Sequence, residues 1–434
     1  MIDMRPKEVS ERRVSVFRAV SAATIGNALE FYDFVTYGLF AIQIGHAFFP
    51  SKDAYASLML SLATFGAGFI TRPIGGILIG AYSDRVGRRP AMMLSFGLMG
   101  AAILVLALIP PYAVIGIAAP ILAVIARMVQ GFSLGGEVGP TTAFLLEAVP
   151  ARRRGFAVSW QGASQAVATA IGGCVGFGLS NLMAPAALDA YGWRIAFLLG
   201  TIALPFGWWI RRTVPETLQA VDDLEESALA NQSSAARARG SIRILALAAV
   251  ILATVTIGGH VGSYTVTYAQ RTLHVAPSVA FLAIIISSVA SAVAMVFGGW
   301  LSDKTGRRPL IIWPALANLL LLFPIYTWIT QSRSAVALTV GMGVLGILGG
   351  LSAGPFYTAV AETLPRRIRG GSFAIVYALS VAVFGGTTQL FITWLIKATG
   401  SSLAPAWLLA ATGAVGLVAR VLILESAPAK AGKR

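Results

Sequence analysis

Long apolar runs recur from one end of this 434-residue chain to the other, and each is close to the length of about 20 residues that crosses a bilayer as a helix. Hydrophobic residues make up 56% of the chain and charged residues 12%, roughly half the charged fraction of an average globular domain. A membrane-spanning chain must satisfy its backbone hydrogen bonds internally, as helices or as a closed barrel of short alternating strands. The long, continuously apolar runs therefore predict an all-α polytopic membrane protein.

The apolar runs and their polar breaks predict twelve spans. Their approximate centres are Tyr32, Phe69, Gly100, Gly131, Thr169 and Ala203 in the first half, and Ile257, Ser288, Leu319, Leu345, Leu379 and Ala414 in the second. The polar segment from Arg211 to Arg243 lies between the halves and suits an interfacial helix or a linker. We expect an N-terminal six-helix half over residues 1–210, a cytoplasmic linker over 211–243 and a C-terminal six-helix half over 244–434.

Lysine and arginine residues are concentrated in alternate loops. Clusters around Arg88, Arg153, Arg307 and Arg367 would lie on one side together with the central linker, whereas the opposite loops hold only scattered basic residues. Loops rich in Lys and Arg remain on the cytoplasmic side of a membrane. This pattern predicts cytoplasmic termini in a bacterial-type inner membrane.

The net charge of +15 does not indicate a nucleic-acid partner, because the basic residues form short clusters between apolar runs, as orientation signals do. Cys174 is the only cysteine, so the sequence excludes an intrachain disulfide and a cysteine-based metal site. We expect no metal and no nucleic acid as partners.

Two motifs each occur twice. SDRVGRRP at Ser83 to Pro90 recurs as SDKTGRRP at Ser302 to Pro309, and EAVPARRRG at Glu147 to Gly155 recurs as ETLPRRIRG at Glu362 to Gly370. The offsets of 219 and 215 residues nearly agree and are each about half of the chain. The repeat predicts two pseudo-symmetric halves of six transmembrane helices, a layout that resembles the major facilitator fold.

The repeated loops combine a carboxylate with arginines at the cytoplasmic ends of helices. Asp84 and Asp303 can each accept from a helix N-terminus or from an arginine across the interface between the halves, which would hold the cytoplasmic side shut in one state. Topology alone accounts for some of these arginines, but the duplicated Asp-x-x-Gly-Arg-Arg pattern favours gating. The predicted gating residues are Asp84, Arg85, Arg88, Arg89, Glu147, Arg154, Asp303, Arg307, Arg308, Glu362 and Arg369.

Few charged residues fall inside the predicted spans, where a buried charge needs a partner or a water-filled cavity. The first half has Glu30, Asp33, Arg72, Arg127 and Glu137, and the second half offers His260. By helical spacing, one face of the first span holds Asn27, Glu30, Tyr37 and either Asp33 or Phe34.

We predict an ion pair between Asp33 and Arg127, across the first and fourth spans. If substrate competes for the arginine, proton binding and substrate binding become coupled. The alternative is a permanent structural ion pair. The candidates for proton coupling are Asp33, Glu30, Arg127 and Glu137.

Several stretches together resemble one branch of the superfamily, the metabolite:proton symporters, which carry citrate, dicarboxylates, shikimate, aromatic acids and betaines. They are NALEFYDFVTYG, FITRPIGGILIGAYSDRVGRR, RMVQGFSLGGEVG and FGGTTQ. Within the branch, SWQGASQAVA and SLMLSLATFGAGFITRP are most similar to the citrate–proton symporters. The resemblance covers almost the whole chain and implies proton-driven import of an organic anion by alternating access.

The resemblance makes Arg72 and Arg127 the best anion ligands, since guanidinium groups match carboxylates bidentately. Gln161 and Gln165 suit substrate hydrogen bonds or interhelical contacts equally, and His260 suits packing as well as binding. Polar residues beside Gly385 and Gly386 suggest a helix break near the substrate. The predicted substrate-binding residues are Arg72, Arg127, Gln130, Tyr32, Tyr37, Gln161, Gln165, His260, Tyr264, Tyr268, Ser380, Thr387 and Thr388.

We therefore expect a monomeric secondary transporter that imports citrate or a related di- or tricarboxylate by proton symport, without a cofactor, with sodium left open as a further coupling ion. The alternatives are a symporter of a zwitterion or aromatic acid, such as betaine or a shikimate-like acid, and a drug exporter. The sequence has no nucleotide-binding Gly-rich loop followed by Lys-Ser/Thr and no His-Glu metal motif, so we do not expect an enzyme.

Overall fold

The computed structural model describes residues 6–86, 88–135, 145–146, 149–202, 205, 234–363, 376–423 and 425–427. Helices dominate this part of the chain, and it contains no strand. Eight helical stretches within it are long and apolar enough to cross a membrane, and Met93–Leu108 and Ala118–Leu134 are shorter apolar helices. The predicted all-α membrane fold is confirmed, and each predicted span centre except Ala203, which lies outside the described residues, falls in a helix.

The N-terminal half is built from helices that bend or restart inside several spans. Its elements are α1 (Pro6–Leu39), α2 (Ala41–Phe48), α3 (Ala54–Ile70), α4 (Arg72–Val86), α5 (Arg88–Leu108), α6 (Tyr112–Ile115), α7 (Ala118–Leu134), η1 (Ala151–Arg153), α9 (Arg154–Leu182), α10 (Pro185–Ala187), η2 (Leu188–Gly192) and α11 (Trp193–Ile202). Asp53 caps α3 by accepting from the Tyr55 amide at 2.9 Å, which satisfies one of the donors that a helix start leaves open. The second predicted span thus comprises α3 and α4, with a single residue, Thr71, between them.

The C-terminal half contains the spans that follow the predicted linker. Its elements are α13 (Ser234–Arg271), α14 (Pro277–Thr305), α15 (Arg307–Ser332), α16 (Ala335–Thr363), η4 (Val381–Gly385), α18 (Gly386–Thr399) and α19 (Ala404–Val421). The predicted linker lies outside the described residues up to position 233, and its residues 234–243 belong to α13.

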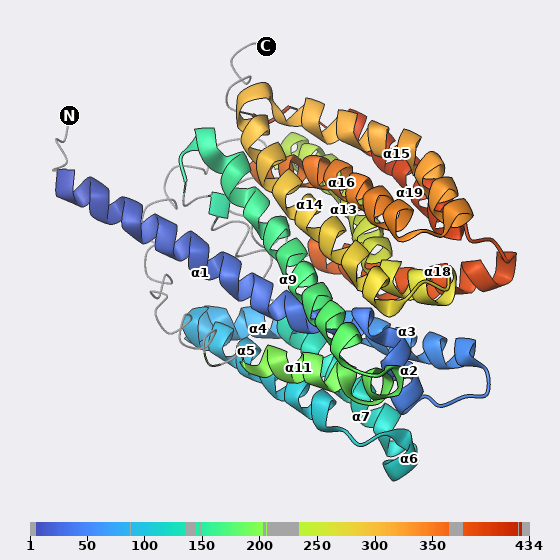
Figure 1. The fold of residues 1–434 in the computed structure, drawn as a ribbon. Helices are drawn as coiled ribbons and strands as arrows, with labels where there is room; N and C mark the ends of the chain where they lie inside the picture. Colours follow the sequence, from blue (N-terminus) through green and yellow to red (C-terminus); the bar gives the residue numbers. More distant parts are fainter. Residues whose placement is uncertain are drawn as a thin grey trace.

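The two halves meet along two seams of small residues. Helix α9 lies beside α14 between the halves, and α3 packs against α18 (Figure 1). A Cβ added at Gly66 would lie 2.7 Å from the Gly386 carbonyl oxygen, and one added at Gly299 would lie 2.7 Å from Ser159 Cβ. Only glycine allows helices to approach this closely, so both seams depend on it.

Candidate functional site

Two buried arginines meet around one aromatic ring in the N-terminal half. Helix α7 approaches α3 so closely that a Cβ at Gly131 would overlap the Gly68 carbonyl oxygen. This approach brings Arg127, one turn before Gly131, and Arg72, at the start of α4, to the same ring of α1. Both guanidinium carbons lie 4.4 Å from the centroid of Phe34.

Hydrogen-bond donors outnumber acceptors in this arginine cluster, which we define as Arg72, Arg127, Gln130, Phe34 and Tyr37. Arg127 Nη1 donates to Gln130 Oε1 at 2.6 Å, and the Tyr37 ring lies 4.7 Å from the guanidinium. Nε and Nη2 of both arginines and Nε2 of Gln130 are buried and find no hydrogen-bond partner in the part of the chain that the structure describes. Burying a cation without an acceptor costs several kcal/mol, so the cluster suits an anion that enters from outside the protein.

The predicted ion pair between Asp33 and Arg127 is not formed, and this prediction is corrected. Asp33 is buried, faces α11, and its Oδ1 contacts the position where a Cβ of Gly200 would stand. That oxygen accepts no hydrogen bond from any described residue. Successive helical residues differ in direction by about 100°, so Phe34 rather than Asp33 reaches the arginines.

Tyr32 also turns away from the arginine cluster. Its hydroxyl donates to the Ala196 carbonyl of α11 at 2.9 Å, which ties α1 to α11. Glu30 is buried on α1 and is engaged in an interaction. Glu137, the remaining candidate for proton coupling, lies outside the described residues.

The polar residues of α9 join helices. Gln161 Nε2 donates to Asn27 Oδ1 at 3.2 Å, while Asn27 Nδ2 donates to the Gln161 carbonyl at 3.2 Å and to Ser164 Oγ at 2.7 Å. These bonds favour the interhelical alternative for Gln161, although its Oε1 lacks a partner among the described residues. Gln165 lies within reach of Tyr377 of the C-terminal half.

His260 of the C-terminal half lies against aromatic rings of the N-terminal half. Its Nδ1 bonds to the Thr256 carbonyl of its own helix at 2.8 Å, and its ring centroid lies 5.4 Å from that of Phe69. Gln389 Nε2 donates to the His260 carbonyl at 3.4 Å and its buried Oε1 lacks a partner within the described ranges. Gln389, the last residue of FGGTTQ, is one of the polar residues beside Gly385 and Gly386 for which the sequence suggests a helix break near the substrate. A Cβ at Gly38 would lie 3.5 Å from Gln389 Nε2, so this amide faces α1.

The other predicted residues of this half bond within it. Tyr264 accepts from Thr393 at 2.9 Å, and Tyr268 donates to the Ser402 carbonyl at 2.7 Å. The hydroxyls of the remaining candidates donate to backbone carbonyls: Ser380 to Ala249, Thr387 to Val383 and Thr388 to Phe384. A π-helical turn, η4, directly precedes Gly386, but the helix continues through it, so the predicted break is not present.

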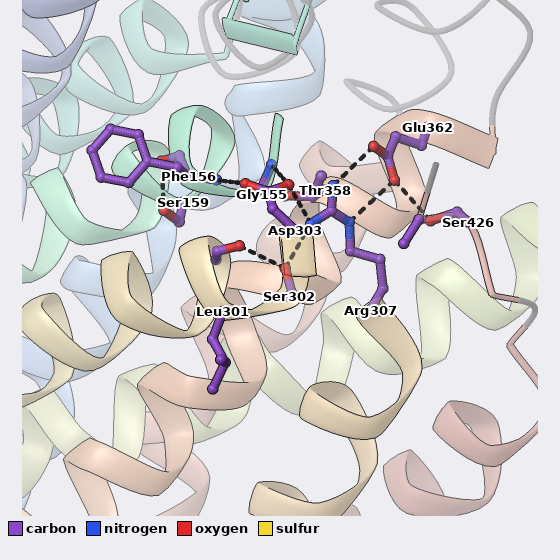
Figure 2. A network of polar contacts seen from close by, with 12 residues as sticks. Gly155, Phe156, Ser159, Leu301, Ser302, Asp303, Arg307, Thr358, Glu362 and Ser426 are labelled. Carbon is purple, nitrogen blue, oxygen red and sulfur yellow. Dashed lines mark hydrogen bonds and ion pairs between the residues drawn. The ribbon is translucent and has the colours of Figure 1, made fainter. Parts of the chain in front are cut away.

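A second charged group, which we call the Asp303 network, joins the halves at the start of α9 (Figure 2). Asp303 accepts from the amides of Gly155 at 2.8 Å and Phe156 at 3.0 Å, as expected for a carboxylate at a helix N-terminus. Arg307 is fully buried and bonds to Asp303 at 2.7 Å and to Glu362 at 3.1 Å.

The segment after α19 completes this network and was not predicted. The Glu425 carboxylate accepts from the Arg307 amide at 2.8 Å and the Arg308 amide at 3.0 Å, which caps α15. Ser426 donates to Glu362 Oε2 at 2.8 Å. Arg308 also donates through Nη2 to the Val421 carbonyl at 2.8 Å. An acidic residue directly after the last apolar run was the available signal in the sequence.

The structure describes only some of the remaining gating candidates. Arg85 is exposed at the end of α4, and Arg154 Nε at the start of α9 is buried without a partner in the described part of the chain. Glu147 and Arg369 lie outside the described residues, as do the side chains of Asp84, Arg88 and Arg89.

Known proteins resemble the chain over nearly its whole length. Residues 23–380 and 246–434 match the family model of the Major Facilitator Superfamily. The chain is 33% identical to a citrate-proton symporter of Salmonella typhi, over 95% of this chain and 94% of that protein. It is 30% identical to a proline/betaine transporter of Escherichia coli (strain K12), over 94% of this chain and 84% of that protein.

A solved structure supports the fold. The xylose transporter XylE from E. coli, in a partially occluded inward open conformation, matches with a TM-score of 0.76 at 20% identity and covers 95% of this chain and 98% of that one. Together with the helical halves and the duplicated charged loops, these matches establish that the chain belongs to the Major Facilitator Superfamily and is a membrane transporter.

Proposed function

We propose that this protein imports citrate or a related di- or tricarboxylate together with protons. The observation that carries the proposal is the excess of buried donors in the arginine cluster, where Nε and Nη2 of Arg72 and Arg127 lack partners among the described residues. A carboxylate oxygen accepts such bonds, and the planar guanidinium group matches it bidentately. An anion with several carboxylates would neutralise both arginines at once.

The relatives support the same class of cargo. The two citrate-proton symporters, from Salmonella typhi and Klebsiella pneumoniae, are 33% and 34% identical to the chain. A betaine-like zwitterion, the cargo of another relative, would bring a cation that needs free aromatic faces or a carboxylate. The Phe34, Tyr37 and Phe65 rings already contact the Arg127 guanidinium, which disfavours that alternative.

We propose Asp33 as the carboxyl that carries the coupled proton, with Glu30 and Glu137 as the alternatives. Asp33 is buried in a membrane span, and an ionised carboxylate there would lack a partner for Oδ1 within the described residues. Because Asp33 faces α11 while Phe34 faces the arginines, coupling would run through a movement of α1 rather than through a direct ion pair.

The network of Asp303, Arg307 and Glu362 would close the cytoplasmic side during alternating access, since it holds α14 of one half to the start of α9 of the other. We further propose that the protein acts as a monomer with cytoplasmic termini, and that residues 211–243 link halves formed by residues 1–210 and 244–434. The proton would be the coupling ion, with sodium left open as a further one.

Uptake of labelled citrate into proteoliposomes tests the proposal. An inward proton gradient should drive accumulation in sodium-free buffer, and a protonophore should abolish it. Accumulation only in the presence of sodium would contradict the assignment of the coupling ion. If no di- or tricarboxylate accumulates under the gradient, the proposed function is wrong.

A further inference from the structure

A pocket with a volume of about 410 Å³ opens between the two halves, away from the arginine cluster. Gln43 and His46 of α2 and Asp189 of η2 line it from the N-terminal half, and Gln270, Arg271 and His274 line it from the C-terminal half. The distribution of Lys and Arg among the loops assigns this end of the bundle to the outside of the membrane.

His46 lies between an acid of its own half and a cation of the other half. Its Nδ1 is 2.8 Å and 3.0 Å from the two Asp189 carboxylate oxygens, and its Nε2 is 2.7 Å from Arg271 Nη2. Arginine only donates hydrogen bonds, so Nε2 must accept and the ring proton must sit on Nδ1, where it is donated to Asp189. The bond that joins the halves here therefore requires a neutral His46.

A proton on Nε2 would turn this acceptor into a donor that faces a guanidinium. The cross-half bond would be lost, and two like charges would stand side by side. The charged and titratable groups that face His46 across the pocket are Asp189, Arg271 and His274. Asp189 would still pair with the protonated ring, whereas Arg271 would lose its acceptor.

Among the buried polar atoms of the pocket that lack a partner in the described residues, there are two donors and one acceptor, Gln43 Oε1. Arg271 Nε and Gln270 Nε2 are buried and have no hydrogen-bond partner in the described part of the chain. The site is nonetheless within reach of solvent, because the side chains of His46 and Asp189 are 38% and 43% exposed. Protonation of His46 would add one positive charge and release the Arg271 guanidinium.

We propose that this pocket is an outer carboxylate-binding subsite that becomes available when His46 takes a proton. One carboxylate group of the substrate replaces His46 as the acceptor for Arg271, and the protonated His46 stays within reach of the same anion. A proton and an organic anion are thus captured together at the outer mouth before the anion reaches Arg127. The inference rests on the proposed function and adds a second place for the same cargo.

Uptake by two substituted proteins tests the subsite. His46→Gln keeps a neutral polar side chain that does not titrate, and Arg271→Gln removes the cation. We compare the KM for external citrate of the wild type with that of His46→Gln at each pH. The ratio of wild-type KM to His46→Gln KM should fall as external pH drops from about 7.5 to about 5.5, the range in which histidine changes charge. Comparing the two proteins at the same pH cancels the ionisation of citrate itself. Arg271→Gln should raise KM at the lower pH about tenfold, which corresponds to about 1.4 kcal/mol.

Lys397→Gln is the matched control. It breaks the pair between Lys397 and Asp53, 3.2 Å apart, which also joins the halves at the outer end but contains no histidine. The Tyr55 amide and Lys397 hold the pKa of Asp53 below its usual range, so the Asp53 carboxylate does not change charge over the pH range in which histidine does. Lys397→Gln should keep the wild-type pH dependence. If His46→Gln also keeps it, or if Arg271→Gln has the wild-type KM, the subsite is refuted.

A binding measurement separates failure of the subsite from failure of the proposed function. In Arg127→Gln the arginine cluster is disabled, and saturation-transfer NMR detects weak binding of citrate to the outer pocket alone. The signal should grow at low pH and disappear in Arg127→Gln/Arg271→Gln. A signal that persists in the double variant would overturn the subsite, as would the absence of any signal in Arg127→Gln. Loss of transport by the wild type would instead overturn the proposed function.

Discussion

The arginine cluster and the Asp303 network differ in how many of their buried hydrogen-bonding groups have partners. Arg307 bonds to Asp303 and Glu362, and Asp303 also accepts from two amides of α9. Arg127 and Arg72 are buried as well, but Arg127 bonds to one amide oxygen, and Nε and Nη2 of both arginines lack a partner in the described part of the chain. A network whose charged groups pair with one another suits a contact that holds two parts of the protein together. A cluster with unpaired donors suits the binding of an external anion.

Replacing one arginine in each cluster tests this difference most directly. Arg307→Gln leaves Asp303 and Glu362 without their shared cation, so the free energy of unfolding should fall by about 3–5 kcal/mol. Arg127→Gln removes a cation without an acid partner among the described residues, so stability without substrate should be retained. Thermal unfolding in detergent, measured by tryptophan fluorescence, compares the two variants. Equal losses of stability in the two variants would contradict the distinction between a structural network and a ligand site.

Binding should be sensitive to the shape of the cation at Arg127. Arg127→Lys keeps the charge but loses the bidentate fork, so the affinity for citrate should fall by about 1.5–3 kcal/mol, roughly 10- to 150-fold. Isothermal titration calorimetry measures the change. Arg194→Lys is the control, because Arg194 donates to the Ala107 carbonyl outside the arginine cluster. Wild-type affinity in Arg127→Lys would remove this residue from the site.

Proton coupling should depend on Asp33 without its touching the substrate. Asp33→Asn cannot exchange a proton, so gradient-driven accumulation should fall to simple equilibration while citrate–citrate exchange continues. Proteoliposomes measure both processes, with Asp53→Asn as a carboxylate control at the end of the bundle. Continued proton-driven accumulation in Asp33→Asn would assign the coupling to Glu30 or Glu137.

The smallest expected effect concerns the segment after α19. Ser426→Ala removes one bond to Glu362, so it should lower the stability of the Asp303 network by about 1 kcal/mol. A small decrease in the midpoint of thermal unfolding checks this result. Ser180→Ala is matched to it, because Ser180 donates only to a carbonyl of its own helix. A larger decrease in the midpoint for Ser180→Ala than for Ser426→Ala would contradict a specific contribution of Ser426 to the Asp303 network.

The fold was predictable because a chain that crosses a bilayer must satisfy its backbone hydrogen bonds internally, which few structures do. Length and apolarity locate helices, and the duplicated loops reveal the halves before any contact is known. The role of Asp303 at a helix N-terminus followed from the same repeat. Each of these inferences depends on residues that are neighbours in the sequence or on the recurrence of a motif.

The site was predictable in its residue types but not in its contacts. Helical spacing left Asp33 and Phe34 as alternatives, and only the packing of α3 and α7 against α1 selects Phe34 as the neighbour of Arg127. Glu425 caps a helix 118 positions away, a contact that no local pattern contains. Gln161 had two roles open, and its bonds to Asn27 became evident only once α1 and α9 were placed side by side.

The solitary cysteine makes the motion of the halves accessible to spectroscopy. Cys174 is exposed on α9, so a single replacement by serine yields a background without reactive thiols. Spin labels attached to new cysteines at the C-terminal ends of α9 and α18, for example at Leu182 and Lys397, would then report the distance between the halves. Recording that distance as proton and citrate concentrations change would follow the opening and closing of the transporter directly.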